Sequence, residues 1–316
     1  MRGRRRNSGR QRGVALITAV LMVALATMLA VDVGFQGFLD QRRSGTLFAI
    51  DQGYEVALGA EAWAADFLKQ DQQNSKIDHL GETWARPLPP LPIEGGTVEG
   101  RLEDMQGRFN LNNLVHTDGT TNPDAVQQLE RILAMLELEP RWATAMADWI
   151  DQDVQPGFPD GAEDTVYTGE NPPHLAANMP VTRASELLVL PGFGPERYAL
   201  LRPYVSALPV GTPLNVCTAP GVVLDALSED SREFSLSTED LAKRRKEACF
   251  PTLEELRGSL GAERFEQLKN SLTESSRYFR ASVWVTIGTT QFTLYSLLAR
   301  GGTGSVRPVL RSFGSE

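Results

Sequence analysis

The chain begins with a pattern typical of one long helix. Residues 14–31 carry no charged side chain, and at 1.5 Å per residue such a run spans about 27 Å, close to the apolar thickness of a bilayer. Beyond it, apolar positions recur every three or four residues as far as Leu68, with acidic residues between them. The pattern predicts a helix that is apolar all round at first and amphipathic later. Glycines predict bends in it, at Gly34, Gly37, Gly45 and Gly53.

The body starts with a short β pattern. Residues 71–96 are polar and then rich in proline, which predicts a loop leaving the helix. Residues 97–103 alternate between apolar and polar positions, and Phe109 and Leu111 alternate in the same way after a turn. These two segments predict a first hairpin.

Helical patterns fill the middle of the chain. Residues 123–138 predict an amphipathic helix with Asn122 as its N-cap. A second helix is expected at 141–150, and a long loop at 151–180 follows it. Shorter helices are expected beyond that loop, at 185–190, 195–201 and 218–227.

Strands return at the end of the chain. Alternating apolar positions predict a strand at 279–287, and a turn at 288–290 leads into another at 291–298. A last strand is expected at 306–312. The order of long helix, hairpin, helical block and hairpin predicts an α+β fold, in which an all-α insertion of more than 130 residues interrupts the sheet.

Charge sets the orientation of the first helix. Six arginines lie within the first twelve residues, and Asp32 and Asp40 follow the apolar run, which predicts a cytoplasmic N-terminus and an external body. The rest of the chain has 25 basic and 40 acidic residues, so it repels nucleic acids and anionic membranes. A buried core helix and a cleaved secretory signal are the alternatives. The adjacent arginines disfavour the first, and the missing small-x-small site with a polar break disfavours the second.

The leader resembles a known secretion signal. A short basic segment ending in Gly13, followed at once by the apolar helix, resembles the signal of type IV pilins and type II secretion pseudopilins. The resemblance implies that a prepilin peptidase cuts between Gly13 and Val14, with methylation of the new N-terminus. Most members carry Glu at the fifth mature position, where it pairs with a neighbour's terminal amine, whereas this chain has Thr18. A subunit without that Glu suits a filament end better than a filament shaft.

Segments of the body resemble the minor pseudopilin K family across nearly the whole chain. They lie at 107–114, 148–153, 161–164, 172–178, 190–194 and 214–216. The resemblance implies a pilin-like α+β fold, in which the long N-terminal helix packs on an antiparallel sheet and the all-α insertion resembles SAM and helix-hairpin-helix domains. The expected domains are a leader at 1–13, a transmembrane helix at 14–31, a pilin-like part at 32–112 and 250–316, and helical insertions at 113–211 and 212–249.

The same resemblance implies a function and a location. It implies a subunit at the tip of the type II secretion pseudopilus that assembles with the minor pseudopilins I and J, initiates or caps the filament, and supports export of folded proteins across the outer membrane. The expected contacts extend to minor pseudopilin H, the major pseudopilin and the prepilin peptidase. The expected location is the bacterial inner membrane, crossed once, with the N-terminus in the cytoplasm and the body in the periplasm.

Residues 148–164 form an acidic loop with six carboxylates and no Lys or Arg. Crowded carboxylates repel one another unless they are solvated, protonated or bridged by a cation. Oxygen ligands on a loop suit Ca²⁺, and the family resemblance also implies bound calcium; an EF-hand is excluded because Pro156 stands where its glycine is needed. A solvated loop and paired-carboxylate catalysis are the alternatives. The candidate ligands are Asp148, Asp151, Asp153, Asp160, Glu163 and Asp164.

Residues 187–201 fit a helix, a Gly-x-Gly turn and a second helix. In DNA-binding proteins such a turn offers backbone N–H groups to a phosphate, so a pilin-like DNA receptor is a rival function. Glu186 and Glu196 flank the turn, and Arg197 and Arg202 are the basic residues nearby. We therefore expect a structural hairpin that binds no nucleic acid.

The two cysteines are Cys217 and Cys249. An even number of cysteines in an oxidising compartment favours a disulfide, with two buried thiols as the alternative. The three histidines are scattered, and no nucleophile or nucleotide-binding motif is present in the sequence. We therefore expect no enzyme, although a membrane-anchored, calcium-dependent enzyme is the second rival.

Overall fold

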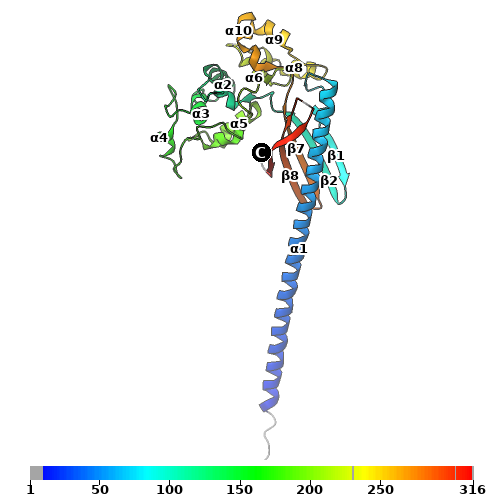
Figure 1. Ribbon diagram of the computed structural model, residues 1–316. Coiled ribbons are helices and arrows are strands. Elements are labelled where there is room, and N and C mark those ends of the chain that lie inside the picture. Colours follow the sequence, from blue (N-terminus) through cyan, green and yellow to red (C-terminus); the bar gives the residue numbers. More distant parts are fainter. Residues whose placement is uncertain (1–9, 230, 303, 315–316) are drawn as a thin grey trace, which may run out of the picture.

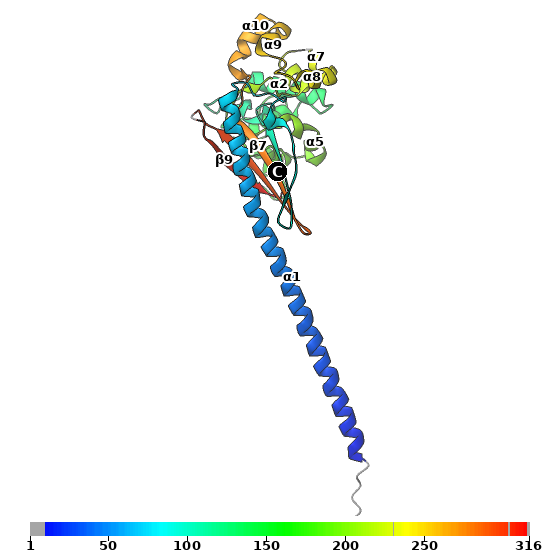
Figure 2. The same ribbon diagram turned by 90° about the vertical axis from the view of Figure 1, so that its right-hand side faces the viewer.

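The computed structural model describes residues 10–229, 231–302 and 304–314, so residues 1–9 of the expected leader lie outside it. Helix α1 (Arg10–Asn74) is a single rod of 65 residues (Figures 1 and 2). It continues without a break through the four glycines at which we expected bends. Within the described residues, α1 is the one helix long and apolar enough to cross a membrane, and its most apolar window has a mean hydropathy of 2.7 and no buried residue.

Five antiparallel strands form a sheet beside the C-terminal part of α1. The strand order is β1–β2–β7–β8–β9, so neighbours in the sheet are also neighbours in sequence except where β2 meets β7. The strands predicted near the C-terminus are confirmed. The bounds are β1 (Leu88–Ile93), β2 (Gly96–Asp104), β7 (Tyr278–Ile287), β8 (Thr290–Arg300) and β9 (Val306–Phe313).

One face of this sheet packs on α1. Successive side chains of a strand point to opposite faces, and β7 and β8 direct their apolar set toward the helix. Phe279 and Leu298 pack with Leu68 of α1, and farther down the strands Val283 packs with Ala57. The packing explains why the amphipathic half of α1 keeps its apolar positions at helical spacing.

The first hairpin differs from the expected one. Strand β2 pairs with β1 on one side and with β7 on the other, whereas β3 (Phe109–Asn110) pairs in parallel with β4 (Val205–Ser206). Strand β1 lies inside the proline-rich segment that we expected to be a loop. Its prolines are tolerated because β1 is an edge strand, where a missing N–H costs no ladder hydrogen bond.

Residues 105–277, here called the helical block, are inserted between β2 and β7 and lie at the end of the molecule away from the start of α1 (Figure 1). The predicted helices are present as α2 (Pro123–Met135), capped by the Asn122 side chain, and α3 (Trp142–Ile150). The remaining elements are η2 (Leu111–Leu114), α4 (Asp164–Tyr167), η3 (Ala184–Val189), α5 (Gly194–Leu201), η4 (Arg202–Tyr204), β5 (Leu214–Asn215), α6 (Gly221–Asp225), α7 (Glu233–Leu236), α8 (Thr238–Arg244), α9 (Leu253–Leu260), α10 (Ala262–Leu268), η5 (Lys269–Ser271) and β6 (Leu272–Thr273), with η1 (Thr83–Ala85) preceding β1.

The helical block extends farther along the chain than we expected. We placed the return to the pilin-like part at residue 250, but the five-stranded sheet resumes at β7. Helices α9 and α10 lie in between and pack Leu256, Phe265 and Leu268 against the core of the block. The disulfide between Cys217 and Cys249 is present inside the same block.

A buried carboxylate joins the helical block to the sheet. Asp104, the last residue of β2, is 8% exposed. Its Oδ2 accepts hydrogen bonds from Asn215 Nδ2 at 2.9 Å, Thr218 Oγ1 at 2.6 Å and Ser276 Oγ at 2.7 Å. Because these donors come from separate segments of the block, the carboxylate fixes the block in one orientation on the sheet.

Candidate functional site

The acidic loop brings three of the six predicted ligands together. Asp151, at the end of α3, Asp153 in the following loop and Glu163, just before α4, each place a carboxylate oxygen within 4.8 Å of the others. Asp151 and Glu163 are each 2% exposed, whereas Asp153 is exposed. The group is therefore a half-open cup of oxygen atoms.

Several buried side-chain oxygens in this cup and next to it lack a hydrogen-bond donor within the described residues. They are Asp151 Oδ1, both carboxylate oxygens of Glu163, and the side-chain oxygen of Asn178. Asn178 belongs to the same place, because its Nδ2 donates to the carbonyl oxygen of Asp153 at 3.0 Å. Buried acceptors without donors are costly, and a hard divalent cation satisfies such a set of oxygens. The donor set thus fits calcium.

The charge state of the cup follows from its burial. Burial raises the pKa of Asp151 to about 6, although the Thr121 hydroxyl stabilises the charged form. Burial, and then the neighbouring carboxylates of Asp148 and Asp151, raise the pKa of Glu163 to about 7. Like charges held this close favour either a shared proton or a bound cation.

The other three predicted ligands lie outside the cup. Asp148 Oδ2 accepts hydrogen bonds from the backbone N–H groups of Gly157 at 2.9 Å and Ala162 at 2.8 Å. Asp164 Oδ1 accepts one from the Ala176 N–H at 2.9 Å. Asp160 is exposed. Asp148 and Asp164 therefore shape the loop through its backbone, a role that a count of carboxylates does not reveal.

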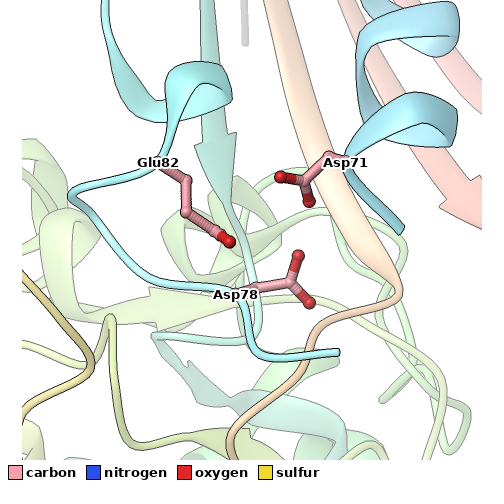
Figure 3. Close-up of side chains that lie close together, drawn as sticks. All are labelled: Asp71, Asp78 and Glu82. Atoms are coloured by element: carbon pink, nitrogen blue, oxygen red, sulfur yellow. The ribbon is translucent and has the colours of Figure 1, made fainter. Parts of the chain in front are cut away.

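A second carboxylate group was missed from the sequence. Asp71 at the end of α1, Asp78 in the following loop and Glu82 lie close together (Figure 3). Arg300 of β8 already supplies their positive charge, with Nη1 2.8 Å from Asp78 Oδ1 and Nη2 3.1 Å from Asp71 Oδ2. This group is an ion-paired junction, and no local motif announces it because Arg300 lies more than 200 positions away in the chain.

The helix–hairpin–helix segment is a structural element. Arg197 makes two hydrogen bonds to Glu139, from Nε at 3.0 Å and from Nη2 at 3.1 Å. Its Nη1 also donates to the carbonyl oxygens of Gly192 and Phe193, each at 3.1 Å. The Arg197 guanidinium is therefore already bonded to the hairpin's own backbone and to Glu139, in the loop between α2 and α3. In addition, the acidic residue Glu196 occupies the first turn of α5. The arrangement gives no support to phosphate binding.

The predicted processing and assembly positions lie on α1. Gly13 and Val14 are exposed residues of this helix. The Thr18 hydroxyl donates back to the carbonyl oxygens of Val14 at 3.1 Å and Ala15 at 3.0 Å. A neutral hydroxyl bonded within its own helix differs chemically from the carboxylate usual at this position.

Comparisons with known proteins agree on one family. The model of the family described as type II secretion system (T2SS), protein K, matches residues 107–210. Type II secretion system protein K of Pseudomonas aeruginosa is 36% identical over 315 residues, covering 96% of this chain and 93% of that protein. The protein of the same name from Aeromonas hydrophila is 30% identical, covering 92% of this chain and 94% of its own length.

A solved structure shares the fold. It is one chain in the crystal structure of the GspK–GspI–GspJ complex from the enterotoxigenic Escherichia coli type 2 secretion system, and its sequence is 27% identical to this one. The superposition covers 87% of this chain and 100% of that chain, with a TM-score of 0.77. A long apolar helix, an antiparallel sheet and an inserted helical block together define a pilin-like, membrane-anchored subunit. The sequence relatives then identify it more closely. The chain belongs to the type II secretion system protein K family and is a minor pseudopilin of that system.

Proposed function

We propose that this subunit sits at the tip of the pseudopilus with the minor pseudopilins I and J, where it initiates or caps the filament and supports export of folded proteins across the outer membrane. The similarity to one chain of the GspK–GspI–GspJ complex supports the choice of these partners. Minor pseudopilin H and the major pseudopilin are the proposed neighbours below the tip. The role is structural and involves no catalysis.

The position of the helical block carries this proposal. Helices α9 and α10 of the block lie past the C-terminal end of α1, whereas α3, α4 and α5 lie beside the sheet (Figure 1). A filament grows by repeating one head-to-tail contact, so each subunit of a shaft needs both ends free for its neighbours. A subunit whose distal end is covered by its own block fits only at an end of the filament.

Thr18 supports the same placement. Within the apolar part of a membrane an uncompensated charge is expensive, so the terminal amine of a neighbouring subunit needs an anionic partner. The Thr18 hydroxyl carries no charge and is already bonded to Val14 and Ala15. The subunit therefore lacks the group that would draw it into the shaft.

Membrane topology and processing belong to the same proposal. Prepilin peptidase cuts the bond between Gly13 and Val14 and so removes the leader. Helix α1 then anchors the subunit in the bacterial inner membrane with its body in the periplasm. The arginine-rich leader and the acidic residues after the apolar run support this orientation. The disulfide between Cys217 and Cys249 supports an oxidising compartment for the body.

The tip assignment is tested by restoring the missing carboxylate. With the major pseudopilin overproduced, Thr18→Glu should raise the number of copies found along sheared filaments, because the new carboxylate can pair with a neighbour's amine. Thr27→Glu is the matched control, since the Thr27 hydroxyl also bonds to its own helix, at Val23 and Ala24. Equal incorporation of both variants and the wild type would refute the role of Thr18, and failure of I and J to co-purify with the wild type would refute the tip assignment.

We also propose that a structural calcium ion occupies the cup formed by Asp151, Asp153 and Glu163. The buried acceptors without donors support it, and the Asn178 side-chain oxygen is a further ligand within reach of the same loop. A bound divalent cation would neutralise the crowded charges and join the end of α3 to the start of α4.

A further inference from the structure

A cleft separates the helical block from one face of the sheet. Phe279 and Leu298 pack toward α1, so their neighbours Arg280 and Leu297 point to the opposite face. On that side, residues of α5 and of the segment before it line the same space as the strands (Figure 1). Two cavities, of about 110 and 580 Å³, lie in the cleft, and they adjoin because both are lined by Leu297 and Leu310.

The lining of this cleft is basic, and we call it the arginine cleft. The smaller cavity is lined by Arg108, Arg183, Arg202 and Arg280, and the larger one by Arg277, Arg300 and Arg307. Among the residues that the structure describes, neither lining contains Asp or Glu. Beyond residue 12 the chain has 25 basic and 40 acidic residues, so the cleft is a local reversal of the sign of the chain's charge.

Part of this positive charge is already compensated. Glu103 pairs with two of these arginines, and the Asp71 junction holds a third. By contrast, Arg183, Arg277 and Arg307 make no ion pair with any carboxylate in the described ranges. Guanidinium groups gathered in a concave site attract anions, and their planar shape suits carboxylates. The cleft therefore has positive charge to offer a carboxylate of another molecule.

A buried hydroxyl in the same cleft also lacks a partner. Ser206 lines the smaller cavity and is 1% exposed. Its Oγ has no hydrogen-bond partner in the described part of the chain. A buried hydroxyl left unsatisfied is costly, and an oxygen acceptor that entered the cavity would remove that cost.

The apolar floor of the cleft selects a polypeptide as its occupant. Leu297 and Leu310 lie where the two cavities meet, and Tyr278 and Tyr295 line the cavities on either side. Val309, which lines the larger cavity, is 48% exposed. A small inorganic anion would leave these apolar groups uncovered. A nucleic acid or an anionic membrane would extend onto the acidic surface outside the cleft, which repels it, whereas a short peptide segment would not.

We propose that the arginine cleft binds a short acidic segment of another polypeptide. Its carboxylates pair with Arg183, Arg277 and Arg307, and its apolar side chains cover Leu297 and Leu310. Clustered arginines recognise acidic motifs in this way in other proteins. The proposal concerns a surface of this chain alone, so its test is independent of the placement at the tip.

The test measures binding of a defined acidic peptide. The probe is fluorescein-labelled Gly-Glu-Leu-Glu-Leu-Glu-Gly, and its fluorescence anisotropy is titrated with the full-length subunit in detergent at low salt. We expect Arg183→Gln combined with Arg307→Gln to weaken binding at least tenfold, because two charge-assisted pairs are lost. Arg257→Gln combined with Lys243→Gln removes two exposed positive charges outside the cleft and should leave the affinity at the wild-type value.

A cross-link keeps the test decisive if the arginine variants fail to fold. Both native cysteines are in the disulfide, so a new cysteine can be labelled alone. Val309→Cys carrying benzophenone should cross-link the peptide on irradiation. Val154→Cys is the matched control, since Val154 is 64% exposed on the acidic loop, and it should give no cross-link.

Equal affinity of the wild type and both double variants, with no cross-link at position 309, would overturn the proposal. Equal binding of a peptide with Ala in place of Leu, together with competition by inorganic polyphosphate as strong as by the unlabelled peptide, would overturn it in favour of a site for anions in general. Binding at least tenfold tighter after removal of residues 315–316 would overturn it in favour of this chain's own residues as the occupant.

Discussion

Arg311 on edge strand β9 holds Glu61 of α1 through two hydrogen bonds, from Nη2 to Oε1 at 2.7 Å and from Nε to Oε2 at 2.9 Å. The Ser296 hydroxyl donates to the same carboxylate. Burial by itself would raise the pKa of Glu61, which is 4% exposed, but Arg311 and Ser296 hold that pKa below its ordinary value. Because Glu61 is an acid on the packed face of α1, this contact fixes which side of the helix meets the sheet.

Removal of the Arg311 guanidinium tests this contact. Arg311→Met leaves the Glu61 carboxylate buried without its cation, and we expect the free energy of unfolding to fall by about 2 kcal/mol. The loss is smaller than for a fully buried pair because the Arg311 side chain is 41% exposed. Urea unfolding measures it, with Arg307→Met at an exposed position of β9 as the control, expected within about 0.5 kcal/mol of wild type. Similar losses for both variants would contradict the assignment.

The Asp71 junction predicts a pH dependence of stability. Burial, with Glu82 and Asp78 nearby, raises the pKa of Asp71 to about 7 in spite of Arg300, whereas in an unfolded chain the value is about 4. The folded state therefore keeps a proton that the unfolded state loses, and this contribution to stability is full below about pH 4 and disappears as the pH rises through 7.

The corresponding experiment compares unfolding free energies at pH 5.5 and pH 8 in the presence of a chelator. We expect the wild type to be less stable at pH 8, and Asp71→Asn to remove part of this difference, because the amide carries no charge to lose. Asp66→Asn changes an exposed carboxylate of the same helix and should keep the wild-type difference. An Asp71→Asn variant with an undiminished difference would show that the junction is not responsible.

Calcium removal tests the acidic cup. A ligand at one hundred times its dissociation constant stabilises the folded state by about 2.7 kcal/mol, so chelation should lower the melting temperature by about 5 °C or more. Asp151→Ala combined with Asp153→Ala should abolish the response, whereas Asp160→Ala, outside the cup, should retain it. A melting temperature that does not respond to chelator and calcium in the wild type would rule the site out.

Processing of the leader makes a separate prediction. The mature subunit should begin at Val14, and intact mass measured on protein from the native membrane checks this directly. Gly13→Asp should leave the arginine-rich leader in place, as should a strain without the prepilin peptidase. A native subunit that retains the leader, or that is cut at another bond, would contradict the assembly model.

Local pattern accounts for much of the fold. The spacing of apolar residues predicts α1, α2, α3 and the strands β7–β9. Helix α2 and the C-terminal part of α1 each bury one face, whereas α3 is buried almost all round. The pattern failed where pairing with another strand, rather than the segment's own sequence, decides the conformation. Strand β1 has three prolines in LPPLPI and becomes a strand only because β2 lies beside it, and the short β3 finds its partner in β4 rather than in β2.

The candidate site shows the same limit. The loop composition indicates a crowded set of carboxylates, but which of them face one another depends on hydrogen bonds to the backbone. Asp148 is drawn to the N–H groups of Gly157 and Ala162, which leaves Asp151, Asp153 and Glu163 to form the cup. The pairing of Arg300 with Asp71 is invisible to local reasoning because only the closed sheet brings the two together.

Asp104 and Phe279 face each other across one rung of the β2–β7 ladder, although the whole helical block separates them in the chain. During synthesis, the edge of β2 that pairs with β7 therefore stays unpaired until the helical block and then β7 have been synthesised. Contacts between such distant segments form slowly, and an unpaired edge invites aggregation. The helical block has its own hydrophobic core and its own disulfide, between Cys217 and Cys249. It can therefore fold before β7 pairs, and its folding brings the end of β2 close to the start of β7. The sheet that gives the molecule its pilin-like form is then the last part of it to close.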